Sequence, residues 1–128
     1  MSLHFPEDRL YHKEHLWAKK EADGSVRIGI SDFAQDRLSS VIFVDLPAIG
    51  AHFAQGESGA ELESVKVTSE AIMPMSGKVV EVNAALGDTP ELLNSSPYDE
   101  GWLVRIIPDD PDEAGLLSAA EYAALVAD

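Results

Sequence analysis

The sequence predicts a mainly β protein that folds as a single domain over residues 1–128, with short flanking helices and a C-terminal helix. From Val41 to Ile107 it contains short segments of high β-propensity, interrupted by glycine and proline: "VIFVDL", "GAELES", "KVVEV" and "WLVRII". An Asp-Gly pair earlier in the chain is typical of a hairpin turn. A chain of 128 residues with 45% apolar content suits one compact core, because two domains would each be too small to bury one securely.

The N-terminal part predicts a hairpin followed by one short helix. "HLWAKKE" and "SVRIGI" read as two strands, and the "ADG" between them supplies the turn. In "SDFAQDRLSS", Ser31 is a suitable N-cap and Asp32 falls in the first helical turn. Phe33, Ala34 and Leu38 are spaced for one buried face of this helix.

The middle of the chain contains a faint internal repeat. "VDLPAIG" (residues 44–50) resembles "VEVNAALG" (residues 80–87), with one extra residue in the second copy. Each copy predicts a strand, a polar turn, an apolar residue and a glycine. Two such copies suit two similar half-sheets that face each other, with Lys66 between them.

The C-terminal segment predicts a helix over about residues 118–127. Ser118 and Glu121 have the spacing of a capping box, and an alanine-rich run follows them. We expect Leu117, Tyr122 and Leu125 to pack this helix on the sheets, as part of the scaffold.

Charge and composition exclude several classes of function. With 23 acidic and 9 basic residues the formal charge is −14, so nucleic acid and anionic membrane surfaces are repelled, whereas basic patches on other proteins are attracted. The absence of cysteine excludes disulfides, thiolate metal sites and a cysteine nucleophile. The first ten residues do not resemble a secretory signal, and no apolar run approaches the roughly 20 residues of a spanning helix. We therefore expect a cytoplasmic monomer, and a mature mitochondrial form would look the same.

Lys66 lies in "ELESVKVTSEAIMPMSG", within a predicted hairpin near residues 60–73. A Schiff-base lysine must be neutral to attack, and Glu61, Glu63 and Glu70 nearby favour the protonated amine. A hairpin tip presents an amine to a modifying enzyme with little obstruction, while its strands hold it in place. Between a solvated turn lysine and an acceptor of covalent modification, the position midway between glycine-marked strand breaks favours the acceptor.

At this point several motifs, taken together, carry a family resemblance. "ESVK" followed by "TSE", then "PMSGKVVEVN", "NSSPYDEGWL", "GISDFAQDRL" and "VIFVDLP" resemble the H proteins of the glycine cleavage system, from about Tyr11 to Tyr122. The resemblance implies a lipoyl-domain-like fold, a flattened barrel or barrel-sandwich hybrid of two antiparallel sheets. It also implies lipoate in amide linkage to Lys66, with Glu63, Ser64 and Val65 as the motif that lipoylating enzymes recognise.

The function that this resemblance implies is that of a non-catalytic carrier. Its lipoyl arm would take the aminomethyl group of glycine from a glycine decarboxylase (P protein) to an aminomethyltransferase (T protein). A dihydrolipoamide dehydrogenase (L protein) would then reoxidise the arm. The physical chemistry agrees, since the arm supplies the sulfur that this chain lacks, and tethering can give an effective concentration on the order of millimolar.

Two positions depart from the family pattern. Members commonly have His-Glu-Trp near the N-terminus, with the Glu beside the cleft that shelters the loaded arm, whereas this chain has Leu16 there. Arg37 stands where some members have His. Glu14 or Glu70 could supply the missing charge and Glu70 could contact the arm, although each is more simply interpreted as a solvated surface acid. These departures keep open an alternative, a relay that donates lipoate or octanoate to 2-oxoacid dehydrogenases or to a dedicated modification system.

Other signals are weaker. His12, His15 and Glu14 have a loose metal-like spacing without a further ligand in view, so no metal site is predicted. A Ser-Lys hydrolase using Ser64 or Ser69 lacks a glycine-rich oxyanion loop. "MPMSGK" lacks the spacing of a phosphate-binding loop. A biotin carrier would be expected to have methionines beside its lysine, where this chain has valines. Met73, Met75, Trp17 and Trp102 are expected in the core.

Overall fold

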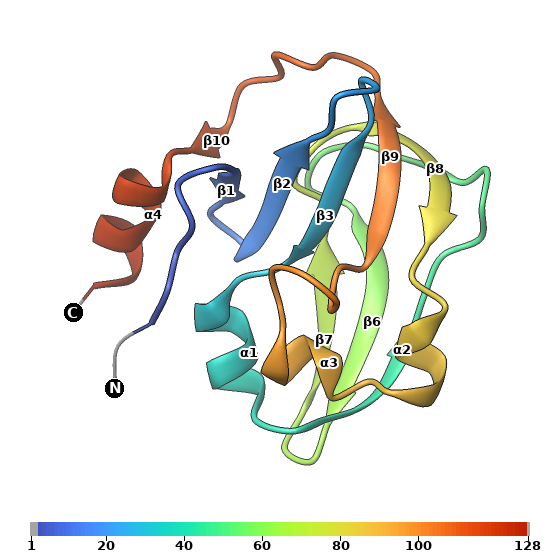
Figure 1. Cartoon of the computed structure of the whole chain (residues 1–128), viewed down its shortest axis with the longest axis vertical. Helices are drawn as coiled ribbons and strands as arrows, with labels where there is room; N and C mark the ends of the chain where they lie inside the picture. The colour runs from blue at the N-terminus through green and yellow to red at the C-terminus, as the bar shows by residue number, and fades with distance from the viewer. Residues whose placement is uncertain (1–2, 128) are drawn as a thin grey trace.

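The computed structural model describes residues 3–127, which form two antiparallel sheets that face each other (Figure 1). The larger sheet has seven strands in the order β10 (Leu116–Leu117), β1 (Leu10–His12), β2 (Leu16–Lys20), β3 (Val26–Ile30), β9 (Val104–Pro108), β8 (Gly77–Val82) and β5 (His52–Phe53). The smaller sheet has the order β4 (Val41–Asp45), β6 (Ser58–Ser64) and β7 (Thr68–Ile72). The helices are α1 (Asp32–Leu38), α2 (Ala85–Asp88), α3 (Leu92–Ser95) and α4 (Ala119–Val126). The predicted mainly β architecture is confirmed.

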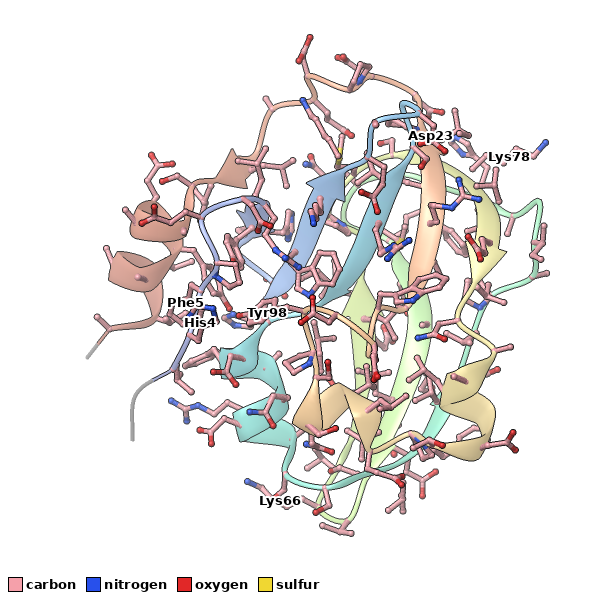
Figure 2. The ribbon with its side chains drawn as sticks, in the orientation of Figure 1. His4, Phe5, Asp23, Lys66, Lys78 and Tyr98 are labelled. Atoms are coloured by element: carbon pink, nitrogen blue, oxygen red, sulfur yellow. The ribbon has the colours of Figure 1, made fainter. Side chains whose placement is uncertain are left out.

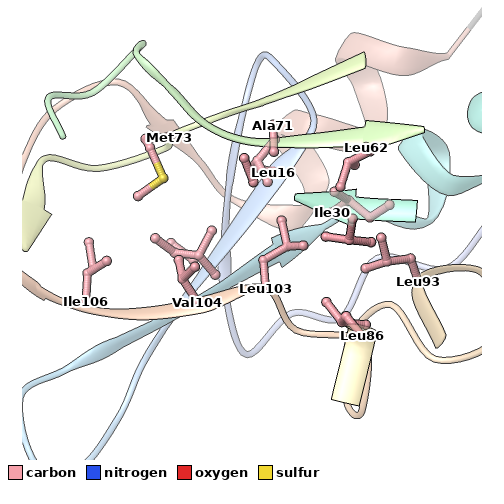
Figure 3. Close-up of a cluster of buried hydrophobic side chains, with 14 of the residues drawn as sticks. Leu16, Ile30, Leu62, Ala71, Met73, Leu86, Leu93, Leu103, Val104 and Ile106 are labelled. Carbon is pink, nitrogen blue, oxygen red and sulfur yellow. The ribbon is translucent and has the colours of Figure 1, made fainter. Parts of the chain in front are cut away.

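The main core lies between the two sheets (Figure 3). In β6 the alternation of the sequence decides the faces, because Leu62 and Ser64 are buried while Glu61 and Glu63 are exposed. Leu62 thus meets apolar side chains of the larger sheet, such as Ile30. The two copies of the internal repeat fall in different sheets, one in β4 and the other in β8.

A second, aromatic cluster covers the opposite face of the larger sheet. Tyr11, Trp17 and Tyr122 are each fully buried there, and the rings of Tyr11 and Tyr122 stack with centroids 4.9 Å apart and planes 9° apart. The Trp17 Nε1 donates a hydrogen bond of 3.0 Å to the Pro97 carbonyl. Because β2 is buried on both faces, its side chains link the aromatic cluster to the main core.

The C-terminal helix α4 begins as the sequence predicts, but it packs differently. The reciprocal capping box between Ser118 and Glu121 is present. Tyr122 is buried, whereas Leu125 is 53% exposed, so the prediction that Leu125 packs on the sheets is wrong. At 100° per residue, Leu125 falls on the opposite side of Tyr122 from Ala119 and Val126, which complete the packed stripe.

The helix α1 also begins where expected, since the Ser31 hydroxyl accepts the Ala34 N–H at 3.1 Å. Only Leu38 on its predicted apolar face is buried, while Phe33 and Ala34 are partly exposed because they line a cavity. The short helices α2 and α3 have four residues each, too few for a periodic signal. Trp102, expected in the core, is only partly buried. Within residues 3–127, no helix has the length and apolarity needed to cross a bilayer.

Replacing Leu103 or Leu125 by alanine tests this description of the core with the same chemical change. Leu103 is 2% exposed, so its loss is expected to lower the free energy of unfolding by about 2–5 kcal/mol. Leu125 is exposed, and its loss is expected to cost less than about 1 kcal/mol. Urea denaturation measures both values, and equal losses would contradict the packing described for α4.

Candidate functional site

The strands β6 and β7 form a hairpin whose tip, residues 65–67, carries Lys66 (Figure 2). The last pair of the ladder joins Glu63 to Thr68, and the Ser64 N–H then donates to the Val67 carbonyl at 2.8 Å. Lys66 is exposed at the end of the molecule farthest from the turn between β2 and β3, where Asp23 is labelled. The structure thus places the lysine at the tip of a hairpin.

The side chain of Ser64 closes this tip from inside. Its hydroxyl oxygen accepts the N–H groups of Lys66 at 3.1 Å and Val67 at 3.0 Å, and its O–H donates to the Val67 carbonyl at 3.1 Å. Ser64 is only 5% exposed. Since its hydroxyl is used within the turn and the Lys66 amine bonds elsewhere, the two do not form a nucleophile and base pair.

The tip is also attached to the last turn of α1 and to the segment that follows it. The Val65 N–H donates to the Ser40 carbonyl at 3.0 Å, and the Lys66 Nζ donates to the Arg37 carbonyl at 3.3 Å. Asn94 of α3 supports this segment, since its Nδ2 donates to the Ser39 carbonyl at 2.6 Å and its Oδ1 accepts the Val41 N–H at 2.8 Å. This role of Asn94 could not be predicted from the sequence, because its partners lie more than fifty residues away.

Carboxylates gather on the outer face of the smaller sheet, beside the tip. In the strand register Asp45 lies opposite Glu61, and Glu61 lies opposite Glu70. Like charges directly across a ladder repel each other, and none of these three forms an ion pair within residues 3–127. Of the predicted recognition motif, Glu63 and Val65 are exposed beside this face while Ser64 is buried.

A cavity of about 420 Å³ lies between the hairpin and α1. Much of its lining is apolar and comes from both sheets and from α1: Leu16, Ile30, Phe33, Ala34, Leu38, Leu62, Val67 and Ala71. Leu16 is 3% exposed in this lining. It therefore contributes an apolar surface at a buried position of the cavity.

Polar residues complete the lining. Glu14, Arg37 and Glu70 are exposed residues that contribute to it. The Arg37 guanidinium lies over the Phe33 ring, 4.8 Å from its centroid. The cavity thus combines an apolar interior with groups of both charges.

His15 is a further lining residue, and its backbone has a φ of 77°. Its Nδ1 lies 2.8 Å from the Tyr122 hydroxyl, and that hydroxyl lies 2.7 Å from the Ser31 hydroxyl. Burial lowers the pKa of His15, while the charge of Glu14 acts in the opposite direction. His15 is therefore neutral near pH 7.

His12 makes different contacts from His15. Burial is the largest cause that lowers the pKa of His12, and its Nδ1 accepts the Glu14 backbone N–H at 3.1 Å. In the part of the chain that the structure describes, no three His, Cys, Asp or Glu side chains are grouped so as to hold a metal ion.

Two facing antiparallel sheets with an exposed lysine at a hairpin tip are the architecture expected of a lipoyl-type carrier domain. Comparison with known proteins gives the family. Residues 9–128 match the model of the glycine cleavage H-protein family. A glycine cleavage system H protein from Oceanobacillus iheyensis is 50% identical over the full length of both chains. One from Escherichia coli is 48% identical over 96% of each.

A solved structure agrees with these sequence relatives. The crystal structure of a glycine cleavage system H protein from Mycobacterium marinum superposes with a TM-score of 0.84 at 42% identity, over 93% of this chain and 96% of that one. The chain belongs to the glycine cleavage H-protein family. The predicted family and fold are therefore confirmed.

Replacing Ser64 by alanine removes three hydrogen bonds from the tip without changing an exposed surface. We expect the Lys66 and Val67 amides to exchange with solvent about five- to tenfold faster, because each such bond contributes roughly 1 kcal/mol. Hydrogen exchange followed by NMR measures this. Ser58→Ala, at the exposed opposite end of β6, is the control, and unchanged exchange in Ser64→Ala would show that the hydroxyl does not close the turn.

Proposed function

We propose that this chain is the lipoyl carrier of a glycine cleavage system and that lipoate is amide-linked to Lys66. The observation that carries the proposal is the position of Lys66, exposed at the tip of a hairpin whose backbone is held by Ser64. An acceptor lysine must reach the active site of a modifying enzyme, and its backbone must be held for recognition. Membership of the H-protein family supports the carrier role.

The residues around Lys66 fit a lipoyl group. The Lys66 amine forms no ion pair within residues 3–127 that acylation would break, and its contact is with a backbone carbonyl. The adjoining cavity offers apolar side chains for an aliphatic arm, with Val67 of the hairpin in its wall. When bound, lipoate would supply a disulfide that can be opened and re-formed, redox chemistry that a chain without cysteine lacks.

The residues of the chain position Lys66 and shelter the arm attached to it. They make or break no covalent bond with the substrate. Ser64 fixes the turn, and the Ser40 carbonyl holds the tip against the segment after α1. Leu16, Leu38 and Leu62 supply an apolar wall to the cavity. Glu14 and Glu70 provide negative charge there, in the role that Leu16 cannot fill, and Glu70 is our candidate for a contact with the arm.

The outer face of the smaller sheet suits partners with basic surfaces. The row formed by Asp45, Glu61 and Glu70 is repulsive within the chain, and cations from a docked protein would relieve it. We propose that the glycine decarboxylase, the aminomethyltransferase, the dihydrolipoamide dehydrogenase and the lipoylating enzymes dock at this end of the molecule. Glu63 and Val65 are exposed for direct recognition, whereas Ser64 contributes through the shape of the turn. The bacterial relatives support a cytoplasmic location.

Co-expression with a lipoate ligase tests the attachment site. The wild-type protein is expected to gain the mass of one lipoyl unit, located on Lys66 by peptide mapping. Lys66→Arg, which keeps the charge but removes the acylable amine, is expected to gain none. Lys78→Arg is the matched control, since Lys78 is an exposed strand lysine distant from the tip (Figure 2), and it should be modified like wild type. Modification of Lys66→Arg at another lysine would overturn the assignment.

Reconstitution with the partner enzymes tests the carrier role separately from the attachment site. Lipoylated protein is expected to support glycine-dependent release of carbon dioxide by glycine decarboxylase. Protein that is fully lipoylated on Lys66 but does not support this release would contradict the carrier role and favour a lipoate relay. The family membership favours the first outcome.

A further inference from the structure

One buried polar contact connects the C-terminal helix to the cavity beside Lys66. Tyr122 of α4 is fully buried, and its ring packs in the aromatic cluster on the outer face of the larger sheet. Its hydroxyl nevertheless reaches through to His15, which lines the cavity, and to Ser31, which caps α1. Phe33 and Arg37 of that helix also line the cavity. A scaffold helix thus touches two of the elements that shape the cavity.

The contacts among Ser31, Tyr122 and His15 indicate which of the three side chains donates each hydrogen bond. The Ser31 oxygen accepts the Ala34 N–H, and the Tyr122 oxygen is its other polar contact within residues 3–127. Because Ser31 is fully buried, its O–H proton needs an acceptor, and Tyr122 is the available one. The Tyr122 O–H is then free to donate to Nδ1 of His15.

The direction of these bonds fixes the state of His15. A neutral imidazole that accepts at Nδ1 carries its proton on Nε2. This Nε2–H has no hydrogen-bond partner in the described part of the chain, and the ring packs against Phe33 with centroids 4.8 Å apart. His15 therefore brings an uncommitted N–H donor to the cavity lining.

We propose that Tyr122 is a positioning residue, which holds His15 as a neutral Nε2–H donor in the wall of the cavity next to Lys66. The inference rests on the proposed function in one respect, the use of this cavity by the lipoyl arm. The donor would serve a hydrogen-bond acceptor on the sheltered group. Eight of the residues in this lining, Leu16 among them, are apolar, so a neutral donor adds a polar group to a largely apolar surface.

The charged groups near His15 come from two elements and act in opposite directions. Glu14, its neighbour in sequence, favours the protonated ring, and Arg37 of α1 disfavours it. From α4 the facing group is Tyr122, which is itself neutral because burial raises its pKa to about 12. Protonating His15 at Nδ1 would remove the acceptor of the Tyr122 hydroxyl and leave one of the two hydroxyl protons, that of Tyr122 or that of Ser31, without an acceptor. The network therefore opposes protonation in addition to burial.

NMR of the histidine ring nitrogens in the unmodified protein tests the proposal. In wild type near neutral pH, Nδ1 of His15 is expected to be unprotonated and Nε2 protonated. Tyr122→Phe removes the donor, so the tautomer ratio should move about 2- to 10-fold toward the Nδ1–H form, and the pKa of His15 should rise. Tyr11→Phe is the matched control, since it removes a buried hydroxyl from the stacked partner ring, whose bond is to the Pro6 carbonyl. It should leave His15 unchanged.

Two results would overturn the proposal. One is a wild-type His15 that carries its proton on Nδ1, a measurement that needs no variant and holds even if Tyr122→Phe fails to fold. The other is a Tyr11→Phe variant that alters His15 as much as Tyr122→Phe does, because the effect would then come from packing alone. The melting temperature of each variant identifies general loss of structure.

A comparison of unmodified and lipoylated wild type separates this inference from the proposed function. The His15 Nε2–H signal is expected to shift on lipoylation of Lys66. If the signal does not move while the tautomer result holds, the arm does not occupy this cavity, and that part of the proposed function is wrong. The role of Tyr122 in fixing His15 would stand in that case.

Discussion

The buried hydroxyl of Ser64 is the contact on which the geometry of the candidate site depends. It joins both ends of a three-residue tip, so that Lys66 leaves the hairpin from a backbone with few alternatives. The attachment of Val65 to Ser40 then sets the tip against the end of α1, beside the cavity. A carrier needs this combination of a backbone that is held in place and a lysine side chain that is exposed to its partners. The lysine reaches different enzymes, while each enzyme meets the same turn.

The two sheets have different roles, since the smaller one carries the lysine hairpin and the larger one supports the elements around the cavity. The smaller sheet carries the hairpin and tolerates a row of opposed carboxylates on its outer face, at a cost in stability. Within the larger sheet β2 is buried on both faces, with the aromatic cluster outside and the main core inside. That rigid layer supports α1 and, through Tyr122, His15. The cavity lies where the layers meet, so its lining includes apolar core residues such as Leu62 and exposed charges such as Glu70.

Local patterns in the sequence were enough to predict the mainly β fold, the Ser31 cap, the capping box at Ser118 and a hairpin around Lys66. These features depend on residues close together in the chain. The features that could not be predicted depend on long-range contacts. Leu125 has the spacing of a packed residue but lies at the edge of the stripe on α4. The support from Asn94, and the hydrogen bond between His15 and Tyr122 across 107 residues, have no signature in a single sequence.

The carrier role requires that the backbone of the tip be rigid beneath an exposed lysine side chain. Backbone ¹⁵N relaxation of the unmodified protein measures this directly, through the order parameters of the Val65, Lys66 and Val67 amides. We expect values of about 0.85, the same as those of β6. Values below about 0.6 at these three amides, with β6 remaining rigid, would contradict it.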